Sequence, residues 1–347
     1  MATPDVFPHA VPAAEAYEAL AVARGRVDPA LRSAVDTLPE DMRRIARYQF
    51  GWTDEHGLPS DASGGKALRP ALTLLAAEAV GGSTDAALPA AVAVELVHNF
   101  SLLHDDLIDT DATRRHRPTA WTVFGSEAAI LAGDALLSLA SGVLADSGNP
   151  AALAGVRLLN DTVQELVQGQ ATDLAFEQRG DVDVDGCQRM AEAKTAALLA
   201  AACELGALFA GAEPRRVEHL RRFGHDLGLA FQHVDDLLGI WGDPETTGKS
   251  AYSDLHARKK TLPVVFALNS DTTAGQRLAT HYHQPSTSEV ALTDIADLVD
   301  AAGGRAWSHA QTDRLLARAL GHLEAAAPTA RTHELTALAH LVTRRDH

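Results

Sequence analysis

The feature that most constrains this chain is an apolar helical stretch that runs directly into a cluster of aspartates. The stretch AAVAVELVHNFSLL, residues 90–103, has the pattern of a mostly buried helix, and Asp105, Asp106, Asp109 and Asp111 follow it at once. Residues four apart share one face of a helix, so Asp105 and Asp109 project together with Asp106 alongside. The chain therefore has to place several carboxylates at the end of a buried helix.

These aspartates are unfavourable unless something neutralises them. Carboxylates near the C-terminal end of a helix are opposed by the helix dipole, by about 0.3–1 kcal/mol each, and clustered like charges repel one another. A divalent cation removes both penalties. Oxygen ligation with room for water suits Mg²⁺, which often bridges protein carboxylates to substrate phosphates. His98 lies seven residues before Asp105 and points the same way. We interpret this polar stripe as part of a Mg²⁺ site.

A second aspartate pair, Asp235 and Asp236, lies on another apolar helical stretch, FQHVDDLLGIWGD, with Gln232 three residues before Asp235. Two such helices facing each other would form a strongly anionic pocket. Basic residues flank both stretches: Lys66, Arg69, Arg114, Arg115, Lys194, Lys249, Lys259 and Lys260. As a set they suit a ligand that carries diphosphate groups, some held through Mg²⁺ and some held directly.

Composition indicates a soluble helical protein and excludes several function classes. Hydrophobic residues make up 46% of the 347 residues, and long Ala- and Leu-rich stretches are separated by Gly and Pro. The net charge of −16 argues against nucleic-acid and anionic-membrane partners. No apolar run reaches the roughly 18–20 residues of a membrane span, no signal peptide is evident, and two cysteines suit a reducing compartment. We expect a cytoplasmic protein with no integral membrane association.

The pattern predicts an all-α fold, with one helical domain over residues 13–347 after a flexible tail of residues 1–12. No segment shows sustained strand alternation, and no fixed-period repeat is present. The predicted helices cover approximately residues 70–80, 88–110, 122–145, 151–177, 188–210, 214–241, 260–269, 306–324 and 332–344.

Several segments together resemble the trans-polyprenyl diphosphate synthases, over about residues 64–345. The segments that carry the resemblance are GGKALRP, VELVHNFSLLHDDLIDTDATRRHRPT, FGSEAAILAGDALL, QGQATDL, AKTAALL, GLAFQHVDDLLGIWGD, TGK and DLHARKKTLPVVFAL. The amino-acid sequences of these segments are most similar to those of bacterial geranylgeranyl diphosphate synthases. Two aspartate motifs with this set of neighbours are a highly specific signal.

The resemblance implies a bundle of about ten or more helices around a deep central cavity, with a homodimer as the usual assembly. The implied reaction is Mg²⁺-dependent head-to-tail condensation. An allylic diphosphate ionises, isopentenyl diphosphate attacks the carbocation, and a proton is lost. Ionisation requires neutralisation of the departing diphosphate, and the carbocation requires a dry apolar cavity. Both requirements fit charged groups at the mouth of an Ala- and Leu-rich bundle.

The resemblance also implies roles residue by residue. The implied metal-binding residues are Asp105, Asp109 and Asp235, with Asp106 and Asp236 in the same motifs. The residues implied to contact the allylic diphosphate are Arg114, Lys194, Lys249 and Lys259, while Thr195 and Gln232 would line the reacting end. The residues implied to hold isopentenyl diphosphate are Lys66, Arg69, His98 and Arg115.

The chain departs from the family pattern at the end of the second motif, where Gly239 replaces the usual third aspartate. In the family the first aspartate of this motif, here Asp235, does most of the ligation. We therefore expect a functional site with weaker Mg²⁺ affinity. The sequence RRHRP also stands where RRGKP is usual, and Arg117 keeps the positive charge.

Phe100 and Ser101, five and four residues before Asp105, bear on product length. On a helix wheel Phe100 lies about 140° from Asp105, so geometry alone does not place it in the path of a growing chain. Family members with Phe and a small residue at these positions, and no insertion in the first motif, resemble twenty-carbon synthases. The resemblance thus implies geranylgeranyl diphosphate as the product.

Three alternatives stay open: a farnesyl diphosphate synthase, a class I terpene cyclase of the same fold, and a non-catalytic subunit of a heteromeric synthase. A cyclase needs no isopentenyl diphosphate site, so the basic set around His98 argues against it. A non-catalytic subunit typically lacks an aspartate motif, and the intact first motif opposes that interpretation.

Two further segments resemble metal sites. Residues 181–192, DVDVDGCQRMAE, fit the pattern of a calcium-binding loop, but no second copy is present and Gln188 stands where an apolar residue is usual. We interpret them as an acidic loop between helices. The HYH segment, residues 281–283, is interpreted as part of a solvated polar loop.

Overall fold

The computed structural model describes residues 13–60, 62, 65–243, 252–283 and 292–344. The helices of the N-terminal half are α1 (Ala13–Val35), α2 (Glu40–Gln49), α3 (Leu68–Ala79), α4 (Thr84–Ile108), α5 (Ala120–Phe124), α6 (Ser126–Ala145) and α7 (Ala152–Glu177). Those of the C-terminal half are α8 (Val184–Ala191), the π-helical turn η1 (Glu192–Ala196), α9 (Ala197–Phe209), α10 (Pro214–Trp241), α12 (Ser253–His256), α13 (Leu262–Leu268), α14 (Thr273–His283), α15 (Leu292–Ala301), α16 (Gly304–Ala325) and α17 (Thr332–Thr343).

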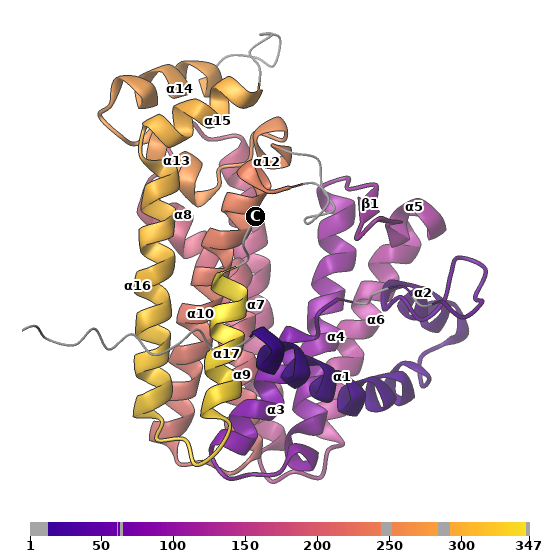
Figure 1. Ribbon diagram of the computed structural model, residues 1–347. Coiled ribbons are helices and arrows are strands. Elements are labelled where there is room, and N and C mark those ends of the chain that lie inside the picture. The colour runs from indigo at the N-terminus through magenta and orange to yellow at the C-terminus, as the bar shows by residue number, and fades with distance from the viewer. Residues whose placement is uncertain (1–12, 61, 63–64, 244–251, 284–291, 345–347) are drawn as a thin grey trace, which may run out of the picture.

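Long helices form the body of the molecule, which confirms the all-α prediction. Figure 1 shows α4, α6, α7, α10 and α16 running along the bundle, with α1 lying across α4 and α6. The helices α14 and α15 cap one end, and α12 lies near that end. In the described chain the only paired strands are β1 (Thr113–Arg114) and β2 (Arg117–Pro118), which form a short antiparallel hairpin after α4.

The centre of the bundle is packed closely because small residues let helix backbones approach one another. Almost every residue of α3 and α9 is buried, as expected for helices that are apolar on all sides. At Gly206 in α9, an added Cβ atom would lie 2.1 Å from the carbonyl oxygen of Thr73 in α3. At Gly224 in α10, it would lie 2.4 Å from the carbonyl oxygen of Leu199. These two glycines therefore set the spacing of three central helices.

Most predicted helices are present, with differences at their ends that have local causes. The helix predicted from residue 88 begins at Thr84, because the Ser83 side chain accepts a hydrogen bond from the Ala86 amide and caps it. The stretch predicted as one helix over 188–210 is interrupted by the π-helical turn η1. The HYH segment lies in α14 and not in a loop, so that interpretation was wrong.

The helices α1, α2, α12, α14 and α15 were not predicted. The helix α1 contains a proline, Pro29, and several charged residues, which obscure its periodicity. Its buried residues nevertheless repeat every three to four positions, at Ala16, Leu20, Ala23, Val27 and Leu31. This spacing was the signal that could have revealed the helix.

Two helices, α4 and α6, are long and apolar enough to cross a membrane by length and composition, contrary to our expectation that no stretch would be. In α4, 67% of the most apolar window is buried inside the protein, as in the core helix of a soluble protein. In α6 only 33% is buried. Ile130 and Leu131 of α6 are among the exposed large apolar side chains.

We expect Gly206→Ala to destabilise the protein, because its methyl group would collide with the rigid backbone of α3. Overpacking of this kind costs about 1–3 kcal/mol. The matched control is Gly321→Ala in α16, where an added Cβ atom meets nothing within 4 Å. This control should be neutral or more stable by about 0.5–1 kcal/mol. Thermal melting followed by circular dichroism measures both, and equal melting temperatures for the two variants would contradict the packing argument.

Candidate active site

The first aspartate motif lies at the C-terminal end of α4, and its carboxylates are held by cations from other elements. Asp106 is 2% exposed and accepts a 2.6 Å hydrogen bond from Nε of Arg114 in β1. Asp109, the residue that ends α4, pairs through Oδ2 with Nζ of Lys259 at 2.8 Å. Burial raises the pKa of Asp105, while the nearby Lys194 lowers it and Asp109 raises it. The three aspartates therefore face different surroundings.

The hairpin after α4 directs three arginines to three places. Its turn residues, Arg115 and His116, both have positive φ angles, of 51° and 61°, as a two-residue hairpin turn requires. Arg114 reaches back to Asp106, as described above. The Arg117 guanidinium donates to the carbonyl oxygens of Tyr48 and Thr53 at 3.2 and 3.1 Å. Arg117 thus fastens the hairpin onto the α2 segment, a structural role that the sequence did not reveal.

A basic group lies beside the middle of α4. Nη1 of Arg69, on α3, is 3.2 Å from Nε2 of His98. A guanidinium can only donate, so Nε2 of His98 accepts and its proton sits on Nδ1. Burial lowers the pKa of His98 well below its ordinary value, and Arg69 and Arg115 lower it further. His98 is therefore neutral at physiological pH.

Arg115 approaches the segment that precedes α3. An added Cβ atom at Gly65 would lie 2.6 Å from Nη2 of Arg115, so this guanidinium lies directly against the glycine. Lys66 follows Gly65 directly, and Ala67 begins the helix in a left-handed conformation with a φ of 52°. The structure thereby brings three members of the predicted set, Arg69, His98 and Arg115, into one region. The fourth, Lys66, is exposed and follows the glycine that Arg115 contacts.

Glu95 is a buried carboxylate in this basic region that the sequence analysis did not single out. It is 8% exposed and lies one turn before His98 on α4. Oε1 accepts a 3.2 Å hydrogen bond from the Asn99 amide. Burial raises the pKa of Glu95 to about 7, although the positive charges of Arg69 and Arg115 lower it. The sequence signal that could have revealed this residue is a glutamate three residues before His98 in an otherwise apolar helical stretch.

The second aspartate motif lies on α10 and is tied to the rest of the site by a chain of hydrogen bonds. Thr195 in η1 donates to Oε1 of Gln232 at 2.5 Å, and Gln232 donates through Nε2 to Oδ1 of Asp236 at 2.6 Å. Oδ2 of Asp236 accepts from the Leu262 amide at 2.8 Å. Burial raises the pKa of Asp236 to about 8. Asp236 is therefore engaged inside the protein, next to Asp235.

Lys194 is presented by the π-helical turn η1. Its Nζ pairs with Oδ2 of Asp173 in α7 at 2.6 Å, and both side chains are about one fifth exposed. At Gly169 an added Cβ atom would lie 2.5 Å from the Lys194 backbone nitrogen, so α7 approaches η1 very closely. Such π turns frequently occur at functional sites. Asp173 belongs to the segment QGQATDL, which carries part of the family resemblance. The sequence analysis did not predict that it pairs with Lys194.

The remaining predicted site residues are Lys249, Phe100 and Ser101. Lys249 lies outside the described residues. Phe100 is buried, and its ring packs edge-on against His104 at 4.8 Å between centroids. The Ser101 hydroxyl donates to the His98 carbonyl oxygen at 2.8 Å.

In the calcium-like segment, residues 181–192, Asp183 accepts from the Gly186 amide at 2.6 Å and caps α8, so this segment begins a helix.

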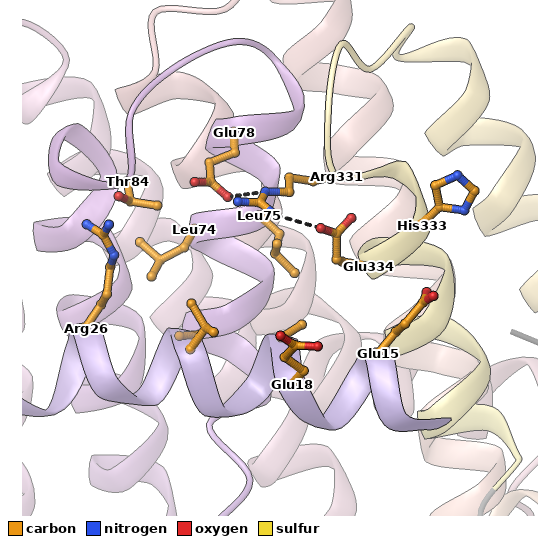
Figure 2. A pocket seen from close by; sticks show the side chains of 13 residues that line it. Glu15, Glu18, Arg26, Leu74, Leu75, Glu78, Thr84, Arg331, His333 and Glu334 are labelled. Carbon is orange, nitrogen blue, oxygen red and sulfur yellow. Dashed lines mark hydrogen bonds and ion pairs between the residues drawn. The ribbon is translucent and has the colours of Figure 1, made fainter. Parts of the chain in front are cut away.

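A separate hollow of about 520 Å³ lies between α1, α3 and α17 (Figure 2). Figure 2 shows Arg331 bridging two glutamates, and its nitrogens lie 2.8 Å from Glu78 and 2.7 Å from Glu334. Glu15 and Glu18 line the same hollow from α1. An excess of carboxylates does not suit a diphosphate, so this hollow is not the candidate active site.

We expect Glu95 to make the protein less stable as the pH rises. Its pKa is raised in the folded state, so the folded protein binds this proton more tightly than the unfolded chain between about pH 4.5 and 7. Across that window the free energy of unfolding falls. Urea unfolding at pH 5 and pH 8 should show a larger loss for the wild type than for Glu95→Gln, by about 1–3 kcal/mol. The exposed Glu324→Gln is the control, and equal losses in all three proteins would refute this assignment.

Comparisons with known proteins identify the family. Residues 59–299 match the polyprenyl synthetase family. The (2E,6E)-farnesyl diphosphate synthase of Mycobacterium tuberculosis is 48% identical over 332 residues, which cover 94% of this chain and 92% of that protein. The geranylgeranyl diphosphate synthase of the same species is 43% identical over 342 residues, which cover 98% and 97%. The crystal structure of a polyprenyl synthetase from Streptomyces coelicolor superposes with a TM-score of 0.88 at 45% identity, covering 94% of this chain and 98% of that one. The chain belongs to the polyprenyl synthetase family.

Proposed function

We propose that this protein condenses isopentenyl diphosphate head-to-tail with an allylic diphosphate, in a Mg²⁺-dependent reaction that gives geranylgeranyl diphosphate. The observation that carries the proposal is the meeting of two differently charged groups on α4. An aspartate-rich group ends the helix, and a basic group surrounds His98 two turns earlier. Two diphosphates, one bound through metal and one bound directly, match these two groups.

The donor chemistry of the aspartate group fits Mg²⁺. We assign metal contact to Asp105, Asp109 and Asp235. Asp106 and Asp236 are buried as well as hydrogen-bonded, whereas Asp109 is partly exposed beside Lys259, so we assign Asp106 and Asp236 to orienting their neighbours. Among the described residues, no group of three acidic, histidine or cysteine side chains is arranged to hold a metal ion. Mg²⁺ is often held by one or two carboxylates together with substrate phosphates and water.

The cations of the site are held in position before substrate binds. Lys194, Lys259 and Arg114 each pair with a carboxylate on another element. In our proposal these three, with Lys249, contact the allylic diphosphate, and bound Mg²⁺ neutralises the charge that grows as this group departs. Preorganised cations need no further reorganisation at that moment, which is how such groups lower a barrier.

In our proposal the second substrate, isopentenyl diphosphate, binds at the basic group around His98. Lys66, Arg69 and Arg115 hold isopentenyl diphosphate, with neutral His98 as a hydrogen-bond partner. Thr195 and Gln232 lie at the reacting end, and their mutual hydrogen bond fixes both side chains. The apolar bundle below excludes water, which would otherwise trap the carbocation.

Three observations bear on the alternatives. The 48% identity to a farnesyl diphosphate synthase favours a fifteen-carbon product as the second candidate. A terpene cyclase would have no use for the basic group around His98. A non-catalytic subunit is opposed by the intact first motif, whose carboxylates are paired with cations from other elements.

We also propose a homodimer located in the cytoplasm. The exposed large apolar side chains include five on α6 and α7, namely Ile130, Leu131, Leu153, Val167 and Leu174. A surface shared by two neighbouring helices of this kind suits a second copy of the chain, since contiguous apolar surface is rarely left to water. The two cysteines are buried and unpaired, as suits a reducing compartment.

We expect Asp105→Asn to lower the condensation rate on the order of a hundredfold or more, because it removes a charge that neutralises the departing diphosphate. Asp185→Asn in α8 is the matched control, because Asp185 is exposed and lies outside the site. Incorporation of labelled isopentenyl diphosphate at saturating Mg²⁺ measures both. Near wild-type turnover in Asp105→Asn would rule out its metal role.

We expect Phe100→Ala to lengthen the prenyl product. Phe100 is a bulky buried residue one turn before the aspartates, and its loss opens space beside His104. Chromatography of dephosphorylated products distinguishes fifteen-, twenty- and longer-carbon chains. An unchanged distribution would mean that Phe100 does not stop the chain, and a fifteen-carbon wild-type product would replace our assignment with the second candidate.

A further inference from the structure

The segment of residues 65–67, directly before α3, has an unusual backbone shape. Gly65 has a φ of 108° and Ala67 has a φ of 52°, so both lie in the left-handed region. Such conformations persist where the surrounding structure holds them in place. Lys66 lies between these two residues, and Arg69 lies in the first turn of α3. The shape of this segment therefore decides where both cations are directed.

A guanidinium from α1 holds the segment. Nη2 of Arg24 donates a hydrogen bond to the carbonyl oxygen of Gly65. The two residues are 41 positions apart in the sequence, so this bond joins α1 to the chain before α3. The helix α1 packs across α3 and α4, which brings the half-buried Arg24 to this place (Figure 1).

A second guanidinium, that of Arg115, lies against the same glycine. Gly65 is thus contacted by one arginine from α1 and by another from the hairpin after α4. Burial lowers the pKa of Arg115, and the positive charges of Arg114 and Arg24 lower it further. Like charges that interact in this way are unfavourable unless anions lie near them. This surplus of positive charge suits a bound diphosphate.

A hollow of about 200 Å³ connects α1 with the interior of the basic group. It is lined by Arg24 and Asp28 of α1, by Gly65, and by Glu95 of α4. Burial raises the pKa of Asp28, while Arg24 and Arg32 lower it. The charge of Asp28 adds to the increase in the pKa of Glu95, which is caused mainly by burial. The charged groups of α1 therefore interact with those of the basic group.

We propose that Arg24 is a positioning residue for isopentenyl diphosphate, which acts by fixing the Gly65 carbonyl and with it the backbone that carries Lys66 and Arg69. The inference rests on the proposed function, because the position of this segment matters only if the basic group takes that substrate. Arg24 acts on the segment and not on the substrate. The helix α1 is then part of the site and more than a cover for the bundle.

The experiment compares substitutions of Arg24 with a matched substitution on the same helix. The variants are Arg24→Ala and Arg24→Lys. The control is Arg26→Ala, because Arg26 is exposed and pairs with Asp85 away from this segment. The readouts are kcat and the two separate KM values, one for isopentenyl diphosphate and one for the allylic diphosphate. Thermal melting reports whether each variant is folded.

We expect Arg24→Ala to raise the KM for isopentenyl diphosphate roughly tenfold, because a hydrogen bond from a charged donor is lost. The KM for the allylic diphosphate should stay near the wild-type value. Arg24→Lys keeps a charged donor and should recover most of the loss, while Arg26→Ala should leave both KM values unchanged. Equal increases in both KM values, or no increase in either, would overturn the proposal. If Arg24→Ala does not fold, Arg24→Gln, which removes the charge and shortens the donor, provides the same test.

The same data separate a structural role from a positioning role. If Arg24 only anchors α1, its loss lowers the melting temperature and the active fraction, and both KM values stay unchanged. If the wild type condenses no isopentenyl diphosphate, the proposed function fails and the role of Arg24 fails with it. If the wild type is active and folded Arg24→Ala keeps both KM values, the proposed function stands and only the role of Arg24 is wrong.

Discussion

The compensation of buried carboxylates is the constraint on which the site depends. Asp106, Asp109 and Asp173 lie on apolar helices and are at most one fifth exposed, so each needs a counter-charge. Each finds one on a different element, from β1, from the segment after α12 and from η1. These carboxylates therefore find their counter-charges only when α4, α7, η1, the hairpin and the α12 segment are assembled.

This pairing also divides the site by charge. Carboxylates predominate at the end of α4, where Asp106 and Asp109 lie, while the positive charges of Arg69 and Arg115 act on His98 and Glu95. A bare diphosphate is repelled by the first region and attracted by the second, whereas a metal-bound diphosphate can enter the first. Under the proposed function, two substrates with the same head group are thus sorted by whether metal accompanies them.

The sequence predicted the helical bundle and the two aspartate motifs because helical periodicity and four-residue spacing are local properties. It did not predict how neighbouring aspartates differ. Asp105 and Asp106 are adjacent, yet only the geometry of the β1–β2 hairpin, with Arg115 and His116 at positive φ, turns Arg114 onto Asp106.

The two relatives of this chain with different product names align with it along nearly their whole length, so overall similarity does not set product length. Under the proposed function, product length depends on the side chains that the growing chain meets near the aspartates. Phe100 packs on His104, and an added Cβ atom at Gly133 of α6 would lie 2.3 Å from Nε2 of that histidine. The position of the Phe100 ring is therefore fixed by how closely α6 approaches α4, and not by Phe100 alone. Under the proposed function, a substitution at Gly133 would move His104 and then Phe100, and would alter the cavity without touching either aspartate motif.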